Sequence, residues 1–326
     1  MGCRLVKIDI PARIHIGLIS LSDNATRRNG GLGFSIADFG TKMTVEAAAS
    51  TEVIDLRDSP LSVDEREKIR RLICTALEKV ASGAAAKIVI EQDSIAPHIG
   101  LGSGTATILG GIESAALVNG VSLDRAALLA LSGRGGASGV GVNTYFDGGY
   151  VFDLGHRRGN GSFTSSDFSF CNEQPVVGWK GALPDWEIGL CIPDIPAPSL
   201  DDERRLFEEI CPIPMSESAL AAYYALFGVH ASVIERDYSG FAQAVEEMQK
   251  LTWKGAEWAL HGDELRQVCA ILRSSGAHAV GMSSLGPSLY FMSDNIAATM
   301  RRAESLLPRA SLAAVYPSRL GRVISD

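Results

Sequence analysis

The sequence has 326 residues, of which 46% are hydrophobic and 21% are charged, and its formal net charge is -8. A chain of this length buries a substantial core, most readily in two domains. The acidic balance without a long basic run argues against nucleic acid as the main partner. No apolar run approaches the roughly 18 residues of a membrane span and no signal peptide is apparent, so we expect a cytoplasmic protein.

The first predicted elements are strands, because apolar and polar residues alternate over 6–10 and again over 14–18. Pro11 separates the two runs. Arg13 and His15 lie on the same face of the second run, opposite its aliphatic face. Two polar side chains are therefore expected to point together from this strand.

Helices and strands then interleave without the regular spacing of a doubly wound sheet, which favours an α+β arrangement of two domains. Ser122 is the expected N-cap of a helix over 121–132. The glycine-dense stretch 133–149 follows it, and 157–185, rich in Gly, Ser and Asn, is expected to be a long loop or a domain crossover. Periodicity predicts strands at 43–46, 87–90, 149–154, 186–192 and 289–292, and helices near 69–80, 108–118, 201–210, 216–235, 238–251 and 262–275.

Six cysteines are scattered along the chain without a C-x-x-C pair or a cysteine and histidine cluster at metal-ligand spacing. We expect buried free thiols rather than redox or zinc groups. These residues are Cys3, Cys74, Cys171, Cys191, Cys211 and Cys269.

The segment Pro97-His98-Ile99-Gly100-Leu101-Gly102-Ser103-Gly104-Thr105 follows a predicted strand and opens a predicted helix. A helix N-terminus offers unpaired N–H groups and partial positive charge, and glycines let the backbone approach an anion closely. Ser103 and Thr105 add hydroxyl donors. We therefore expect Gly100, Leu101, Gly102, Ser103, Gly104 and Thr105 to hold phosphate, rather than to form only a tight turn. No Gly-Lys-Ser/Thr ending is present, so the loop is not a Walker A loop.

This loop, P-x-x-G-L-G-S-G-T before an apolar helix, resembles the second motif of the GHMP kinase superfamily. A late glycine-rich loop over 281–288 stands where that superfamily has a facing loop. The resemblance implies an N-terminal α+β domain with a left-handed crossover over 1–170 and a ferredoxin-like C-terminal domain over 171–326. The site would lie between them.

Within the superfamily the chain is more similar to the β-ribofuranosylaminobenzene 5'-phosphate synthase family. The matching stretches span residues 13 to 287, nearly the whole chain. They are Arg13-Ile14-His15-Ile16-Gly17-Leu18, Arg28-Asn29-Gly30-Gly31-Leu32-Gly33, Gly133-Arg134-Gly135-Gly136-Ala137-Ser138-Gly139-Val140-Gly141-Val142, then Phe146, Gly148-Gly149 and Gly155-His156, and Ser283-Ser284-Leu285-Gly286-Pro287.

One position separates synthase from kinase. Many kinases of this superfamily carry Ser-Gly-Val-Asp, whose carboxylate helps to activate the hydroxyl that attacks ATP. Here Ser138-Gly139-Val140 is followed by Gly141. Asp147 and Asp153 are near in sequence, but nothing in the sequence indicates that either substitutes, so ordinary phosphoryl transfer is disfavoured.

The resemblance implies that phosphoribosyl pyrophosphate (PRPP) is joined to 4-aminobenzoate or 4-hydroxybenzoate, with loss of CO2 and pyrophosphate. Loop 100–105 would stabilise the departing pyrophosphate, and Mg2+ is expected as its partner. An ATP-dependent small-molecule kinase is the first alternative, and a ligand-binding protein without activity is the second. By family habit a homodimer is expected.

The candidate catalytic residues are Arg13, Arg28 and His15. Either arginine could hold a carboxylate or the 5'-phosphate through its guanidinium fork, and His15 could donate to the substrate or shuttle a proton. A core histidine and exposed arginines are the alternative readings. Further phosphate-binding candidates are Arg134, Ser283, Ser284 and Gly286, and His156 is comparable to Arg134.

Other conspicuous residues have simpler explanations. His98 is expected to pack the loop entrance, and Trp253 and Trp258 are expected to be core residues rather than walls for a benzoate ring. Residues 201–203, Asp-Asp-Glu, are expected to start a helix, although an acidic residue there could also hold Mg2+.

Overall fold

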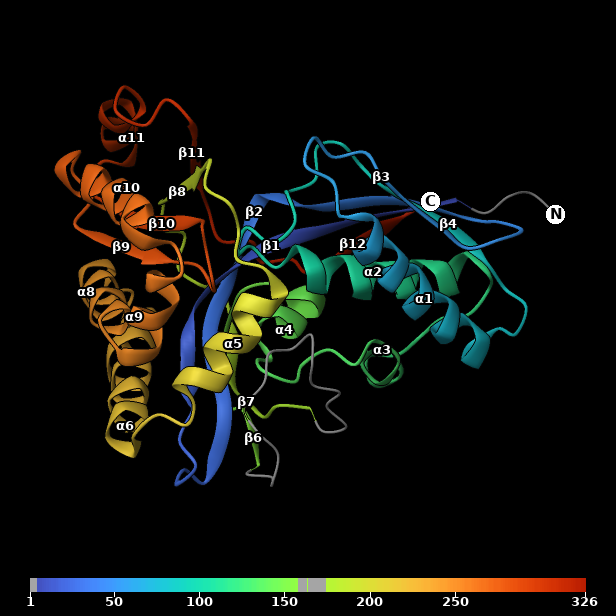
Figure 1. Cartoon of the computed structure of the whole chain (residues 1–326), viewed down its shortest axis with the longest axis horizontal. Coiled ribbons are helices and arrows are strands. Elements are labelled where there is room, and N and C mark those ends of the chain that lie inside the picture. The colour runs from blue at the N-terminus through green and yellow to red at the C-terminus, as the bar shows by residue number, and fades with distance from the viewer. Residues whose placement is uncertain (1–4, 158–162, 164–173) are drawn as a thin grey trace.

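The computed structural model describes residues 5–157, 163 and 174–326, and two long antiparallel strands, β1 (Leu5–Ser20) and β2 (Arg27–Ala47), cross the molecule (Figure 1). The prediction of two short strands around Pro11 is wrong, because β1 is continuous. The register with β2 shifts between Pro11 and Ala12, and such an irregularity accommodates a proline that lacks an N–H group. The same sheet also contains β3 (Glu52–Asp55), β4 (Ala86–Ile90), β5 (Tyr150–Asp153), β6 (His156–Arg157), β7 (Val177–Gly181) and β12 (Val323–Ser325).

Two helices pack on this sheet. Helix α1 (Val63–Val80) contacts β3 and α2, and helix α2 (Ser103–Val118) contacts β1, β2 and β4. The first begins with a capping box, in which Ser62 and Glu65 exchange side-chain and backbone hydrogen bonds. The second is buried over most of its length, as its apolar sequence predicts. The predicted helix around 69–80 is confirmed, and so is the predicted buried helix after loop 100–105, which we call the glycine loop.

The helix boundaries after α2 differ from the expectation. Helix α3 (Arg125–Ser132) begins after Asp124, whose carboxylate accepts from the N–H of Ala127, so the prediction of Ser122 as N-cap is wrong. Helix α4 (Val140–Asp147) forms inside the glycine-dense stretch, where no helix was predicted. Its N-terminal end lies beside the candidate site described below.

The second sheet is antiparallel, with strand order β11 (Ala310–Val315), β8 (Ile188–Pro193), β10 (Leu289–Met292), β9 (Ala279–Met282). The predicted strand at 289–292 is confirmed. The predicted loop 157–185 contains β7, and its residues 158–162 and 164–173 lie outside the described part. The helices of this half are α5 (Leu200–Ile210), α6 (Met215–Tyr223), the π-helix η1 (Tyr224–His230), α7 (Ala231–Glu235), α8 (Tyr238–Gln249), α9 (Thr252–Ala259), α10 (Gly262–Ser274) and α11 (Ile296–Glu304).

One buried cluster joins the two halves. Phe34 of β2 packs edge-on against Phe241 of α8 and Tyr290 of β10, with ring centroids 6.4 and 6.5 Å apart. Ile14 and Ile16 of β1 belong to the same cluster. The expected α+β class with two sheets is confirmed, and β1 lies where the two halves meet.

The cysteines that the structure describes are free. Cys191 is buried, as expected, whereas Cys74, Cys211 and Cys269 are half-buried. Cys3 and Cys171 lie outside the described residues. Within the described ranges, no helix combines the length and the apolar character that crossing a membrane requires.

Candidate active site

A cavity of about 230 Å³ opens where β1, the glycine loop and the late loop meet. Side chains and backbone from β1, α1, α2, α4, α5, α9 and the late loop line it. It therefore collects segments from both ends of the sequence, as the position of β1 between the two halves requires.

The glycine loop presents the N-terminus of α2 to this cavity. Gly100 and Gly102 have φ angles of +82° and +86°, which a residue with a side chain adopts only under strain. Gly102 is the N-cap of α2 and provides no capping side chain. The first helical N–H groups lack partners within a helix, so Ser103, Gly104 and Thr105, which line the cavity, offer an anion-binding end.

The late loop braces the glycine loop from the opposite side. Ser283 Oγ donates to the carbonyl oxygen of Gly100 (2.7 Å) and accepts from the N–H of His15 (3.0 Å). Ser283 is fully buried and does not line the cavity, whereas Ser284 and Gly286 do. The hydroxyl of Ser283 thus connects the late loop to the glycine loop and to β1.

Arg13 lies beside the helix N-terminus. Its Nη1 donates to the carbonyl oxygen of Gly100 (2.7 Å), and its own N–H donates to the carbonyl oxygen of Leu101 (3.0 Å). The side chain of Leu101 is buried in the core. Burial lowers the pKa of Arg13 to about 10, against the opposing effect of Glu203, so the guanidinium remains charged at neutral pH. A fixed positive charge therefore adjoins the anion-binding end of α2.

His15 also lines the cavity, so the expectation that Arg13 and His15 point together is confirmed. Its Nε2 lies 3.2 Å from Ser138 Oγ. Burial, and then the charges of Arg13 and Lys254, hold the pKa of His15 well below its ordinary value. His15 is accordingly a neutral imidazole, which exchanges hydrogen bonds but adds no charge.

The remaining candidate residues, Arg134, Arg28 and His156, differ in whether they line the cavity. Arg134 lines the cavity. Arg28 does not, and its guanidinium carbon lies 3.9 Å from the ring centroid of Phe163. His156 is buried outside the cavity, with Nε2 2.9 Å from the carbonyl oxygen of Gly135. The structure thus gathers Arg13, His15 and Arg134 around the anion site and leaves Arg28 and His156 apart from it.

The two carboxylates considered as replacements at position 141 face elsewhere. Asp153 is fully buried and accepts from the N–H groups of Gly139 (2.6 Å) and Gly155 (2.7 Å). Asp147 is paired with Arg125 and Lys180. Neither lines the cavity, whereas Gly141 does. The wall of the cavity at α4 therefore carries no carboxylate among the described residues.

Three carboxylates from other elements do line the cavity within the described ranges: Glu65, Glu203 and Glu257. Glu203 lies on α5, where the predicted helix start is confirmed by a capping box between Ser199 and Asp202. Sequence reasoning missed Glu65 and Glu257. Each belongs to a helix pattern that is typical of a solvated face, and nothing in the sequence indicated burial.

The tryptophans divide between core and cavity. Trp258 is buried in the core of the second half, as expected. Trp253 is also buried and packs against Phe207 with ring centroids 4.6 Å apart, yet both rings line the cavity. Leu18 and Leu285 extend the same apolar wall.

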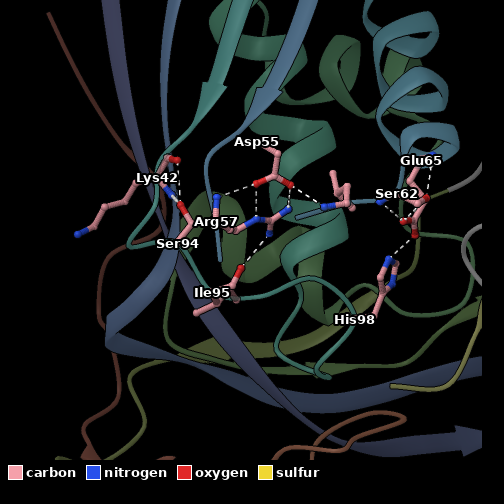
Figure 2. Close-up of polar contacts among 9 residues, drawn as sticks. Lys42, Asp55, Arg57, Ser62, Glu65, Ser94, Ile95 and His98 are labelled. Atoms are coloured by element: carbon pink, nitrogen blue, oxygen red, sulfur yellow. Dashed lines mark hydrogen bonds and ion pairs between the residues drawn. The ribbon is translucent and has the colours of Figure 1, made fainter. Parts of the chain in front are cut away.

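A polar network holds the start of α1 against the glycine loop (Figure 2). Arg57 forms a buried ion pair with Asp55 (2.7 Å) and donates to the carbonyl oxygen of Ile95 (2.8 Å). Beyond it, Nε2 of His98 lies 2.5 Å from Oε1 of Glu65. His98, which precedes the glycine loop and was expected to pack at the loop entrance, thus contacts α1 and also lines the cavity.

Changing Asp55 to Asn is expected to lower the free energy of unfolding by about 3 kcal/mol, because it leaves the buried charge of Arg57 without its counter-ion. Burial opposes ionisation of Asp55, but hydrogen bonds from Arg57 and Leu61 outweigh it and lower the pKa of Asp55. The carboxylate therefore stabilises the fold above its unfolded pKa of about 3.9, and this contribution is lost as pH falls through the lower folded value.

Urea unfolding of Asp55→Asn over a series of acidic pH values checks this prediction, with the exposed Asp58 changed to Asn as the matched control. A wild-type pH dependence in Asp55→Asn would contradict it.

Solved structures with the same fold include kinases and a decarboxylase. The chain aligns with a homoserine kinase from Cytophaga hutchinsonii with a TM-score of 0.67 and 17% identity, covering 98% of this chain and 97% of that one. It aligns with mevalonate diphosphate decarboxylase from Staphylococcus aureus with a TM-score of 0.67 and 12% identity, covering 99% and 98%. These likenesses establish the fold of the GHMP kinase superfamily.

Proteins related in sequence identify a more specific family within this superfamily. The chain is 31% identical to β-ribofuranosylphenol 5'-phosphate synthase from Archaeoglobus fulgidus over 92% of this chain and 91% of the relative. It is 29% identical to the protein of that name from Methanothermobacter thermautotrophicus, over 88% of each. No protein-family model matches the sequence. The chain belongs to the β-ribofuranosylphenol 5'-phosphate synthase family.

Proposed function

We propose that this enzyme joins PRPP to 4-hydroxybenzoate or 4-aminobenzoate, with loss of CO2 and pyrophosphate, in tetrahydromethanopterin biosynthesis. The observation that carries the proposal is a helix N-terminus beside Arg13, in a cavity whose α4 wall has Gly141 and, among the residues that the structure describes, no carboxylate. The name of the relatives denotes a phenol product, which favours 4-hydroxybenzoate as the acceptor.

The α2 end of the cavity suits a departing pyrophosphate. As the bond from C1 of the ribose to pyrophosphate breaks, negative charge grows on the leaving group and C1 becomes oxocarbenium-like. The N–H groups at Ser103 to Thr105 and the guanidinium of Arg13 would stabilise that charge. Arg134 and the backbone at Ser284 and Gly286 are proposed as further phosphate contacts.

The apolar wall suits the aromatic acceptor. Leu18, Phe207, Trp253 and Leu285 offer flat and aliphatic surfaces against which a benzoate ring packs. The ring carbon that bears the carboxylate then attacks C1, because the para hydroxyl or amino group supplies electrons to that carbon. Trp253 thereby combines a buried position with a wall of the proposed acceptor pocket.

We propose that Mg2+ enters with the phosphates of PRPP. Over the described ranges, no group of three or more His, Cys, Asp or Glu side chains is arranged to hold a metal ion. Mg2+ commonly takes one or two carboxylates together with substrate phosphates and water. Glu203 lines the cavity and would serve as such a carboxylate, and the ion would neutralise charge on the leaving group.

The test is an incubation of purified protein with PRPP, Mg2+ and each benzoate. We expect release of CO2 and pyrophosphate with at least one acceptor. Transfer of labelled γ-phosphate from ATP to a metabolite would instead identify the kinase alternative. Binding of PRPP without turnover of either benzoate would identify a ligand-binding protein without activity.

We propose that the protein forms a homodimer. We also propose that it is located in the cytoplasm. Helix α6 and the π-helix η1 expose Leu220, Tyr223, Leu226 and Phe227, with exposed fractions between 41% and 67%. Such a patch commonly marks an interface between proteins. Sedimentation equilibrium of the purified protein, with the mass of a single chain as the contradicting result, tests the dimer.

A further inference from the structure

A buried ion pair lies next to the proposed acceptor pocket. Lys254 Nζ is 2.6 Å from Glu257 Oε2 and donates to the carbonyl oxygens of Met282 and Ser284, both at 2.8 Å. Two N–H groups of the ammonium are thus hydrogen-bonded to the late loop, and the ion pair with Glu257 provides a counter-charge for the buried ammonium. Lys254 therefore connects the late loop to Glu257.

The carboxylate of Glu257 can accept further hydrogen bonds. Its Oε1 accepts from Trp253 Nε1 (2.9 Å), and its side chain lines the cavity. A carboxylate accepts about four hydrogen bonds, so the contacts with Trp253 and Lys254 leave room for a ligand donor. Trp253 is also part of the apolar wall, so the carboxylate adjoins the place proposed for the aromatic ring.

The other carboxylates of the cavity are less suited to this position. Glu65 is bound to Ser62 and His98 at the α1 end. Glu203 lies on α5, and its charge acts on Arg13. Burial, the largest influence, raises the pKa of Glu257 above its ordinary value, although Lys254 and Trp253 oppose the shift. A higher pKa makes a carboxylate a stronger base.

We propose that Glu257 accepts the proton of the acceptor's para hydroxyl group as the carbon–carbon bond forms. The proposal rests on the proposed function and assigns a catalytic residue to it. Lys254 is a positioning residue, because its ion pair with Glu257 favours the ionised form of the carboxylate and fixes it beside Trp253.

The electrons and protons balance without a further reactant. The ring carbon bearing the carboxylate bonds to C1 of the ribose, and the electrons of the broken C1–O bond leave with pyrophosphate. The hydroxyl proton moves to Glu257, and the ring becomes a cyclic dienone. The bond to the carboxylate then breaks, CO2 leaves, its electrons restore the aromatic ring, and Glu257 returns the proton to the phenol oxygen.

The test compares two acceptors on the same variant. Glu257→Gln keeps the size of the side chain and the acceptor for Trp253 but removes the base. With 4-hydroxybenzoate we expect kcat to fall about 100-fold. With 3,5-difluoro-4-hydroxybenzoate, whose hydroxyl is ionised in a mildly alkaline buffer because fluorine withdraws electrons, no base is needed, and the ratio of wild-type to variant kcat should approach one.

Both acceptors are compared on one protein preparation. Partial unfolding of Glu257→Gln therefore lowers the apparent kcat equally for both acceptors and does not affect the comparison. Glu113→Gln is the matched control: Glu113 is buried and paired with Arg322 but lies outside the cavity. It should show the same ratio of wild-type to variant kcat with both acceptors. Equal loss with both acceptors in Glu257→Gln, or no loss with 4-hydroxybenzoate, would overturn the proposal. Failure of the wild type with every acceptor would instead refute the proposed function.

Discussion

Arg13→Ala is expected to lower kcat/KM for PRPP by up to about a thousandfold, the largest loss among the single changes considered. The guanidinium of Arg13 lines the cavity and contacts the glycine loop through the carbonyl oxygen of Gly100. Its removal takes away a preorganised charge at the point where the leaving pyrophosphate becomes more negative. Arg13→Lys, which retains the charge but loses the planar fork, should lose less activity.

Initial rates at varied PRPP concentration, together with PRPP-induced thermal shifts, check this prediction. Arg28→Ala is the matched control, because Arg28 lies on the neighbouring strand β2 but outside the cavity. An equal loss in both variants would place the charge requirement elsewhere and would contradict the site described here.

Gly100→Ala is expected to lower kcat/KM about 100-fold and to destabilise the fold by about 1 to 3 kcal/mol. The residue has a φ angle of +82°, and a Cβ atom there would lie 2.3 Å from the carbonyl oxygen of Ser283. The glycine loop must then move away from the late loop, and the N–H groups of α2 leave their positions in the cavity.

Gly83→Ala separates backbone strain from displacement. Gly83 has a similar φ angle of +76°, but its Cβ would meet no atom within 4 Å. We expect it to cost about 1 kcal/mol of stability and to leave turnover unchanged. Chemical denaturation and steady-state assays of both variants provide the comparison. A Gly100→Ala enzyme with wild-type turnover would show that the spacing of the two loops does not matter.

Much of the site followed from local patterns in the sequence. Alternation along β1 was sufficient to pair Arg13 with His15, because a period of two is independent of the rest of the fold. The glycine loop was recognisable because a strand, glycines and a helix occur in sequence within a few residues. These inferences required no knowledge of distant packing.

The missed features depend on tertiary contacts. Lys254 and Glu257 are three residues apart on a helix, a spacing that usually indicates a solvated ion pair, and only packing against the late loop buries them. Arg28 carries the same guanidinium as Arg13, but no local pattern tells which strand segment faces a cavity. Helix α4 forms despite Gly141 near its start, because contacts with β1, β2 and β5 outweigh poor intrinsic propensity.

The edge-on contacts of Phe34 with Phe241 and Tyr290 restrict how the enzyme admits its substrates. Closure of two domains on a hinge requires an interface that can slide or open, whereas here one buried cluster contains residues of both halves. We therefore expect access to the cavity to depend on local movements of the loops that line it, rather than on separation of the halves. The same continuity means that heat should melt the halves together, so a calorimetric scan should contain one cooperative peak.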